Sequence, residues 1–157
     1  MNKRILENLT RQHKALHVLK HIQEEEFSYL REFKPQSVGA LEFSIQELMR
    51  QLMVERKCVR RMIGEVVPGA TRLTQLTEYF GEEWAQVEDL LSKIDALEQT
   101  CAKQAEKSYA LALALFDQSS GYVDFFKQKL TPTKQSYGPR GVFAKTKPAP
   151  AMLRGAL

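Results

Sequence analysis

Residues 82–130 read EEWAQVEDLLSKIDALEQTCAKQAEKSYALALALFDQSSGYVDFFKQKL, without proline and with Gly121 as the only glycine. Residues at steps of three and four fall on one stripe of an α-helix. Here that stripe is mostly apolar and consists of Val87, Leu90, Ile94, Leu97, Cys101, Gln104, Ser108, Leu111, Leu115, Gln118, Tyr122 and Phe125. At the rise of an α-helix its length would be about 70 Å. Such a helix cannot bury its stripe alone, so we expect other helices or a partner to cover it.

Residues 2–33 and 38–64 carry the pattern of two further helices. Pro35 separates them, because proline disfavours helical geometry in the residue before it, and Ser37 is the expected N-cap of the second helix. That helix has a heptad seam of Val38, Leu41, Ile45, Leu48, Leu52, Glu55, Val59 and Met62. A break and a short helix at 72–80 lead into the long helix. The sequence predicts an all-α fold, an elongated antiparallel three-helix bundle or coiled coil with a long third helix and no sheet.

The third helix exceeds the first two by about 25 Å, which corresponds to roughly residues 112–130. Residues 109–116 are apolar on every face, as is typical of an enclosed helix. Apolar side chains on an uncovered segment mark a binding surface. The predicted partner-binding residues are Leu111, Leu115, Tyr122, Phe125 and Phe126. Gly121 leaves two alternatives open: the helix continues through it, or it breaks there and folds back.

The domain organisation follows from composition. Residues 1–130 form the predicted helical bundle, and residues 131–157 form a flexible, basic, proline-rich tail. The tail carries five basic residues and no acid, so the net charge of +4 leaves a net of −1 for the rest of the chain. We interpret the tail as solvated and expect no nucleic-acid partner. No apolar run reaches the length of a membrane span, and a cytoplasmic location is the expectation.

No catalytic signature is present, so we expect neither an enzyme nor a cofactor. Cys58 and Cys101 are interpreted as small core residues of a protein in a reducing compartment. His13, His17 and His21 lie on one face at steps of four, a spacing that can chelate a metal. Without further ligands we interpret that face as solvated and expect no metal site.

The order of elements resembles the FlgN family of flagellar type III export chaperones. The resemblance is carried by a leucine-rich helix, a heptad helix with Glu55-Arg56, a break, a long helix and then Tyr137-Gly138-x-x-Gly141. It implies a cytoplasmic chaperone that binds C-terminal helical segments of hook–filament junction proteins through residues 108–130. It further implies that Tyr137, Gly138 and Gly141 dock to the membrane protein of the export gate. The tail after Gly141 departs from the family pattern.

A second interpretation is a structural or adaptor coiled-coil protein that self-associates through its helical seams, and a homodimer is therefore a further expected partner. A symmetric coiled coil has a narrow apolar stripe. Residues 109–126 are apolar over more than a stripe, which favours the chaperone.

Overall fold

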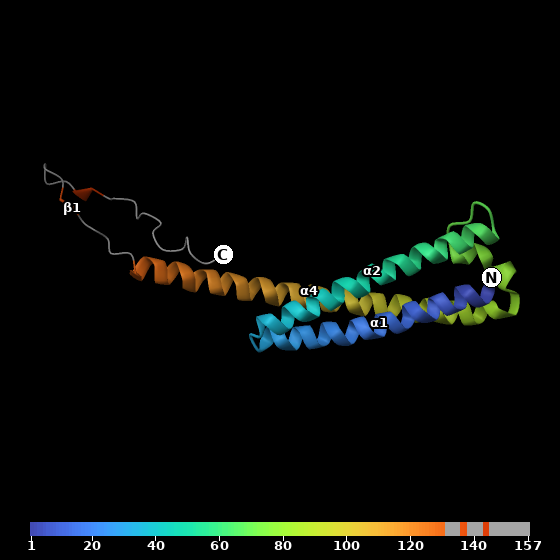
Figure 1. Ribbon diagram of the computed structural model, residues 1–157, viewed down its shortest axis with the longest axis horizontal. Coiled ribbons are helices and arrows are strands. Elements are labelled where there is room, and N and C mark those ends of the chain that lie inside the picture. Colours follow the sequence, from blue (N-terminus) through green and yellow to red (C-terminus); the bar gives the residue numbers. More distant parts are fainter. Residues whose placement is uncertain (131–135, 138–142, 145–157) are drawn as a thin grey trace. The chain divides into compact units, whose positions relative to one another are not determined.

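The computed structural model describes residues 1–130, 136–137 and 143–144 (Figure 1). Three long helices confirm the all-α prediction. The elements in chain order are α1 (Asn2–Arg31), α2 (Pro35–Val66), the 3-10 turn η1 (Leu73–Leu76), α3 (Thr77–Phe80), the 3-10 turn η2 (Gly81–Glu83), α4 (Trp84–Leu130), β1 (Ser136–Tyr137) and β2 (Phe143–Ala144). None of the helices in these ranges is long and apolar enough to cross a membrane.

The chain divides into two units, Met1–Ala112 and Leu113–Leu157. In the first unit, α1 and α2 run antiparallel side by side, and the N-terminal part of α4 lies along them (Figure 1). The amide of Asn2 donates to Glu83 Oε2 at 2.9 Å, which places the start of α1 beside the start of α4. Because α1 and α2 are joined by only three residues, an antiparallel arrangement is the simplest that they can adopt.

The second unit contains the remainder of α4 and a short pairing that the sequence did not predict. Strands β1 and β2 are antiparallel, with Ser136 opposite Ala144 and Tyr137 opposite Phe143. The pairing involves only two residues on each side, and the described residues form the all-α fold that the sequence predicts. The rest of the predicted tail lies outside the described residues, and the division at residue 130 remains a prediction.

The turn between α1 and α2 explains where the second helix begins. Phe33 has a φ of 54°, and the amides of Phe33 and Lys34 donate to the carbonyls of Leu30 and Tyr29. This is the Schellman arrangement, which ends a helix with one left-handed residue. Pro35 is then the first residue of α2, a position where its missing N–H costs nothing. The predicted start at residue 38 and the predicted Ser37 cap were wrong. The second helix begins at Pro35 itself, directly after the turn that ends the first helix.

The core confirms the predicted stripe of α4 over its first half. The buried residues of α4 are Val87, Ile94, Cys101 and Ser108, spaced by seven, and the half-buried Leu90 and Leu97 pack against the core. They meet Ile5, Leu9, Leu16 and Leu19 of α1 and the seam of α2. The Cys101 thiol donates to the Leu16 carbonyl at 3.8 Å, and burial raises the pKa of that thiol. A buried, protonated thiol of this kind is a packing residue.

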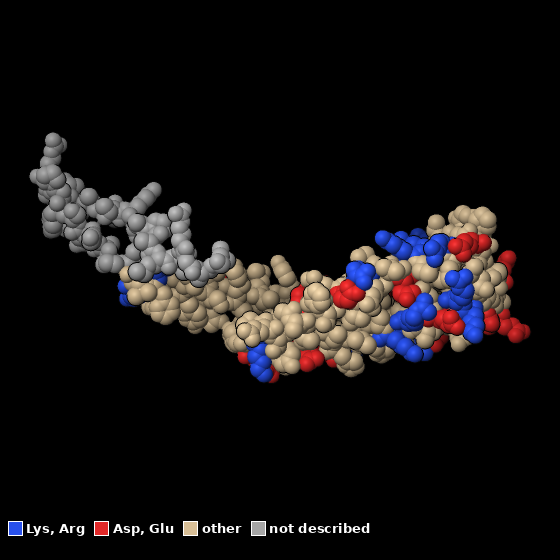
Figure 2. All heavy atoms as spheres, in the orientation of Figure 1, with Lys and Arg blue, Asp and Glu red and all other residues tan. Residues whose placement is uncertain are grey.

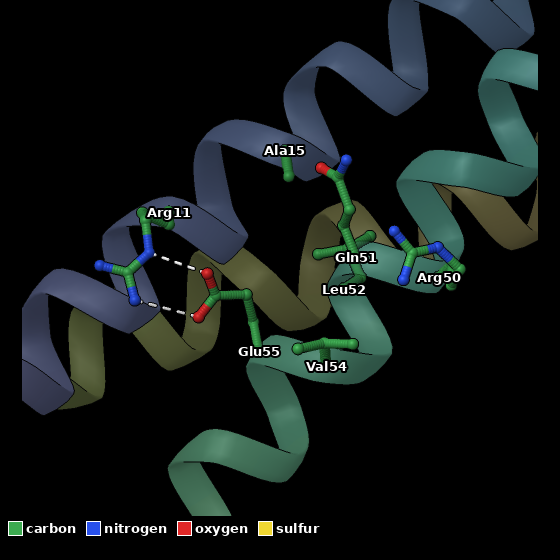
Figure 3. Close-up of a pocket in the computed structure, with 7 residues that line it drawn as sticks. All are labelled: Arg11, Ala15, Arg50, Gln51, Leu52, Val54 and Glu55. Atoms are coloured by element: carbon green, nitrogen blue, oxygen red, sulfur yellow. Dashed lines mark hydrogen bonds and ion pairs between the residues drawn. The ribbon is translucent and has the colours of Figure 1, made fainter.

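A polar cluster interrupts the seam between α1 and α2. The Glu55 carboxylate accepts hydrogen bonds from Arg11 Nε at 2.9 Å and from Arg11 Nη2 at 3.0 Å (Figure 3). It also accepts from the side-chain amide of Asn8. Asn8 is fully buried, and its Oδ1 accepts from Gln12 Nε2 at 2.7 Å. The cluster therefore satisfies a buried amide, which explains the single polar position in the predicted heptad seam of α2.

Glu55→Ala should lower the free energy of unfolding by about 1–3 kcal/mol, because it removes the carboxylate acceptor of the buried Asn8 amide and leaves only the backbone carbonyl of residue 55, at 3.3 Å, to accept from it. Arg11→Ala removes only the half-exposed partner and should cost less than about 1 kcal/mol. Urea unfolding of both variants measures the difference. Equal losses would show that the ion pair, and not the Asn8 amide, is the stabilising contact.

A buried carboxyl also lies between α1 and α2. Glu26 is buried, and burial, together with a hydrogen bond to the Glu42 carboxyl of α2 and the charge of Glu42, raises its pKa to about 7. The unfolded chain titrates near the ordinary value, so native Glu26 holds a proton that the unfolded chain has lost. Stability is therefore full below pH 4.5 and falls as the pH rises toward 7.

Glu26→Gln should remove this pH dependence, because glutamine keeps the neutral shape at every pH. We expect the melting temperature of the variant to exceed that of the native chain at pH 8 and to match it near pH 4.5. Glu88→Gln, an exposed position of α4, is the matched control and should change neither value. A variant that is less stable at pH 8 would contradict the raised pKa.

Candidate functional site

The candidate site is the C-terminal part of α4, residues 113–130, named the distal segment. The last buried residue of α4 is Ser108, and no residue of the distal segment is buried. Its exposed large apolar side chains are Leu113, Phe116, Tyr122, Val123, Phe125, Phe126 and Leu130. Phe116 is 68% exposed and Leu130 is 78% exposed. So dense a set of exposed apolar side chains is unusual for a monomeric surface and is typical of a surface that meets a partner.

The distal segment is helical for local reasons. Residues 110–115 alternate alanine and leucine, the two strongest helix formers, and the segment contains no proline. The helix continues through Gly121, where one glycine costs only about 1 kcal/mol. The structure thereby decides between the two alternatives at Gly121 in favour of a continuous helix.

Six apolar side chains of this segment lie on one side of the helix, whereas Leu113 and Phe125 lie off that side. At 3.6 residues per turn, an arc of about 120° holds Leu115, Phe116, Tyr122, Val123, Phe126 and Leu130. Asp117 and Asp124 lie nearly opposite, by the same rule. On the face that Figure 2 shows, this segment carries little charge before its C-terminal end. An apolar arc of this width can accept the apolar face of another helix.

Local contacts hold several of these side chains in place. The rings of Phe125 and Phe126 meet edge to face, with centroids 5.8 Å apart. Lys129 Nζ lies 5.7 Å from the centre of the Phe125 ring, and Gln118 Nε2 donates to the Tyr122 hydroxyl at 3.3 Å. Side chains that are already ordered lose less entropy when a partner binds.

The predicted site residues fall into three groups. Tyr122, Phe125 and Phe126 are exposed, Leu115 is half-buried, and Leu111 is half-buried within the first unit. Tyr137 lies in β1, whereas Gly138 and Gly141 lie outside the described residues. The predicted site omitted Leu113, Phe116, Val123 and Leu130, which are apolar residues off the seam. Their position off the seam was the sequence signal that could have identified them as exposed apolar residues.

Two further features of the first unit fall short of a ligand site. His13 and His17 meet edge to face with ring centroids 4.7 Å apart, and burial lowers the pKa of His13. Across the described residues, no three His, Cys, Asp or Glu side chains are arranged to hold a metal.

A hollow of about 320 Å³ between α1 and α2 is lined by Arg11, Ala15, Arg50, Gln51, Leu52, Val54 and Glu55 (Figure 3). Its arginines already pair with Glu55 and Glu47, so the hollow is a weak ligand site.

Comparison with known proteins supports one family. A family model described as FlgN protein matches residues 1–143, which is nearly the whole chain. No curated protein and no solved structure matches the chain.

Proposed function

Because the chain belongs to the FlgN family of flagellar export chaperones, we propose that it binds C-terminal helical segments of hook–filament junction proteins in the cytoplasm and delivers them to the export gate. FlgN is a family of chaperones and not of enzymes, so binding is the chemistry to explain. The supporting observation is the exposed apolar arc of the distal segment. An amphipathic client helix would cover this arc and shield its own apolar face during delivery.

The binding step is tested with the full chain and a C-terminal fragment of a hook–filament junction protein. We expect calorimetry to show saturable binding with a negative heat-capacity change, the signature of buried apolar surface. A fragment from the middle of the same junction protein is the control and should not bind. Absence of binding by the C-terminal fragment would overturn the proposed client.

The alternative partner of the same arc is a second copy of this chain. A second copy could bury the distal segment until a client arrives, since the same apolar side chains suit either helix. Sedimentation of the free chain and of the client complex separates the alternatives. If the chain forms a dimer that the client fragment does not dissociate or bind, the structural coiled-coil interpretation is favoured.

Delivery is proposed to depend on Tyr137. Tyr137→Ala should weaken binding to the cytoplasmic domain of the export-gate membrane protein by about tenfold or more, the usual effect of losing an aromatic anchor. Capture of the client fragment should stay unchanged, because Tyr137 lies outside the distal segment. Tyr109→Ala, at an exposed tyrosine of α4, is the matched control. Loss of both activities in Tyr137→Ala would show that gate and client share one site.

A further inference from the structure

The outward side of α2 carries a second surface, separate from the distal segment and contained in the first unit. Eight exposed residues fall within an arc of about 160° on this helix, from Arg56, which pairs with α4, to the edge where Arg50 and Val54 also line the hollow beside α1. These residues, named the α2 outer face, are Met49, Arg50, Met53, Val54, Arg56, Lys57, Arg60 and Arg61. Nothing in the client-binding proposal uses them.

The face is strongly basic. Arg50 pairs with Glu47 at 2.7 Å, Arg61 pairs with Glu65 at 3.7 Å, and Arg56 pairs with Glu98 of α4. Lys57 and Arg60 have no carboxylate within ion-pair distance among the described residues. Figure 2 shows Lys and Arg side chains gathered over the C-terminal half of α2. The surface therefore keeps two uncompensated positive charges side by side.

Apolar side chains stand next to these charges. Met49, Met53 and Val54 are each about half exposed, at 49%, 56% and 56%. Together with Lys57, Arg60 and Arg61 they form two neighbouring ridges at steps of three and four. Methionine side chains adapt to the shape of a partner, and an unbranched thioether surface suits a helix laid along it. From Met49 to Arg61 the face spans about 18 Å, or more than three helical turns.

We propose that the α2 outer face docks an acidic amphipathic helix of a partner protein. Apolar side chains of that helix would cover Met49, Met53 and Val54, and its carboxylates would meet Lys57 and Arg60. Electrostatic complementarity of this kind selects the partner and speeds the encounter.

The charges argue against other occupants. The chain's own segment 131–157 carries five basic residues and no acid, so it would be repelled. A second copy in two-fold symmetry would place the positive patch against itself. A nucleic acid would leave the apolar ridge uncovered, and the face has no aromatic ring on which a base could stack.

The test uses a fluorescent helical peptide with leucine at every third or fourth position and glutamate elsewhere. The protein is the full chain with Phe116→Asp and Phe126→Asp, so that the distal segment does not capture the probe. We expect anisotropy to report binding that weakens with salt. Adding Lys57→Glu and Arg60→Glu should weaken binding about tenfold or more, and adding Met53→Ala instead should weaken it several-fold. Circular dichroism checks that each variant remains folded.

Two controls make the test specific. Lys103→Glu with Lys107→Glu reverses two exposed lysines of α4 and should leave binding unchanged. A probe with serine in place of leucine should bind at least about tenfold more weakly. The proposal is overturned if the probe does not bind, if both charge reversals weaken it equally, or if the serine probe binds as well. Equal competition by an RNA oligonucleotide would also overturn it, because the face would then be a general polyanion site.

Discussion

Replacing Phe116 and Phe126 by aspartate should weaken capture of a junction-protein fragment by more than about 100-fold and change the melting temperature by less than about 2 °C. Each ring is a candidate anchor whose loss typically costs about 2 kcal/mol of binding free energy, and about 1.4 kcal/mol corresponds to tenfold in affinity. Both rings are more than half exposed in the free chain, so their replacement removes little packing. Calorimetry with the fragment and thermal unfolding of the same samples give the two values.

Phe125→Asp provides the sharpest control for this prediction, because it makes the same change one residue earlier. Phe125 lies about 60° beyond the edge of the apolar arc, whereas Phe126 lies within it. We therefore expect Phe126→Asp to reduce affinity more than Phe125→Asp. The reverse order would show that the client follows the seam that ends at Phe125. Unfolding of the double variant would show that the distal segment belongs to a core.

The sequence predicted the helices well because their seam positions, most of them apolar, recur at steps of three and four. The stripe of Val87, Ile94, Cys101 and Ser108 is a strict seven-residue repeat, and the structure buries all four. The start of α2 was mispredicted because a proline is compatible with both the end of one helix and the first turn of the next. Periodicity gives the faces of a helix more reliably than its ends.

The polar residues of the core show that a single sequence does not identify the partners of a polar side chain at a seam position. Glu55 was visible as an exception in its seam, but its partners Asn8 and Arg11 lie more than 40 residues away on another helix. Glu26 lies on α1, and only the structure brings it to Glu42 of α2. A polar residue at a seam position therefore indicates a cross-helix contact without naming its partner.

The sequence predicted where the candidate site lies but did not identify all of its residues. The seam rule selected Leu111 and Leu115, which are half-buried, and it omitted Phe116, which is among the most exposed apolar residues of α4. A seam follows the side of a helix that packs within its own chain. A surface for another protein consists of apolar residues that the chain leaves uncovered, and only the exposure of each side chain separates the two sets.

The difference between buried and exposed apolar residues gives a final prediction, which compares the same substitution at two leucines. Leu19→Ala should lower the free energy of unfolding by about 2–5 kcal/mol, because Leu19 is almost fully buried and its loss opens a cavity in the core. Leu113→Ala should change it by less than about 0.5 kcal/mol, since Leu113 is nearly half exposed and alanine is an excellent helix former. Urea unfolding measures both values. If Leu113→Ala is as costly as Leu19→Ala, the distal segment is part of the folded core, and its apolar side chains are not available to a client.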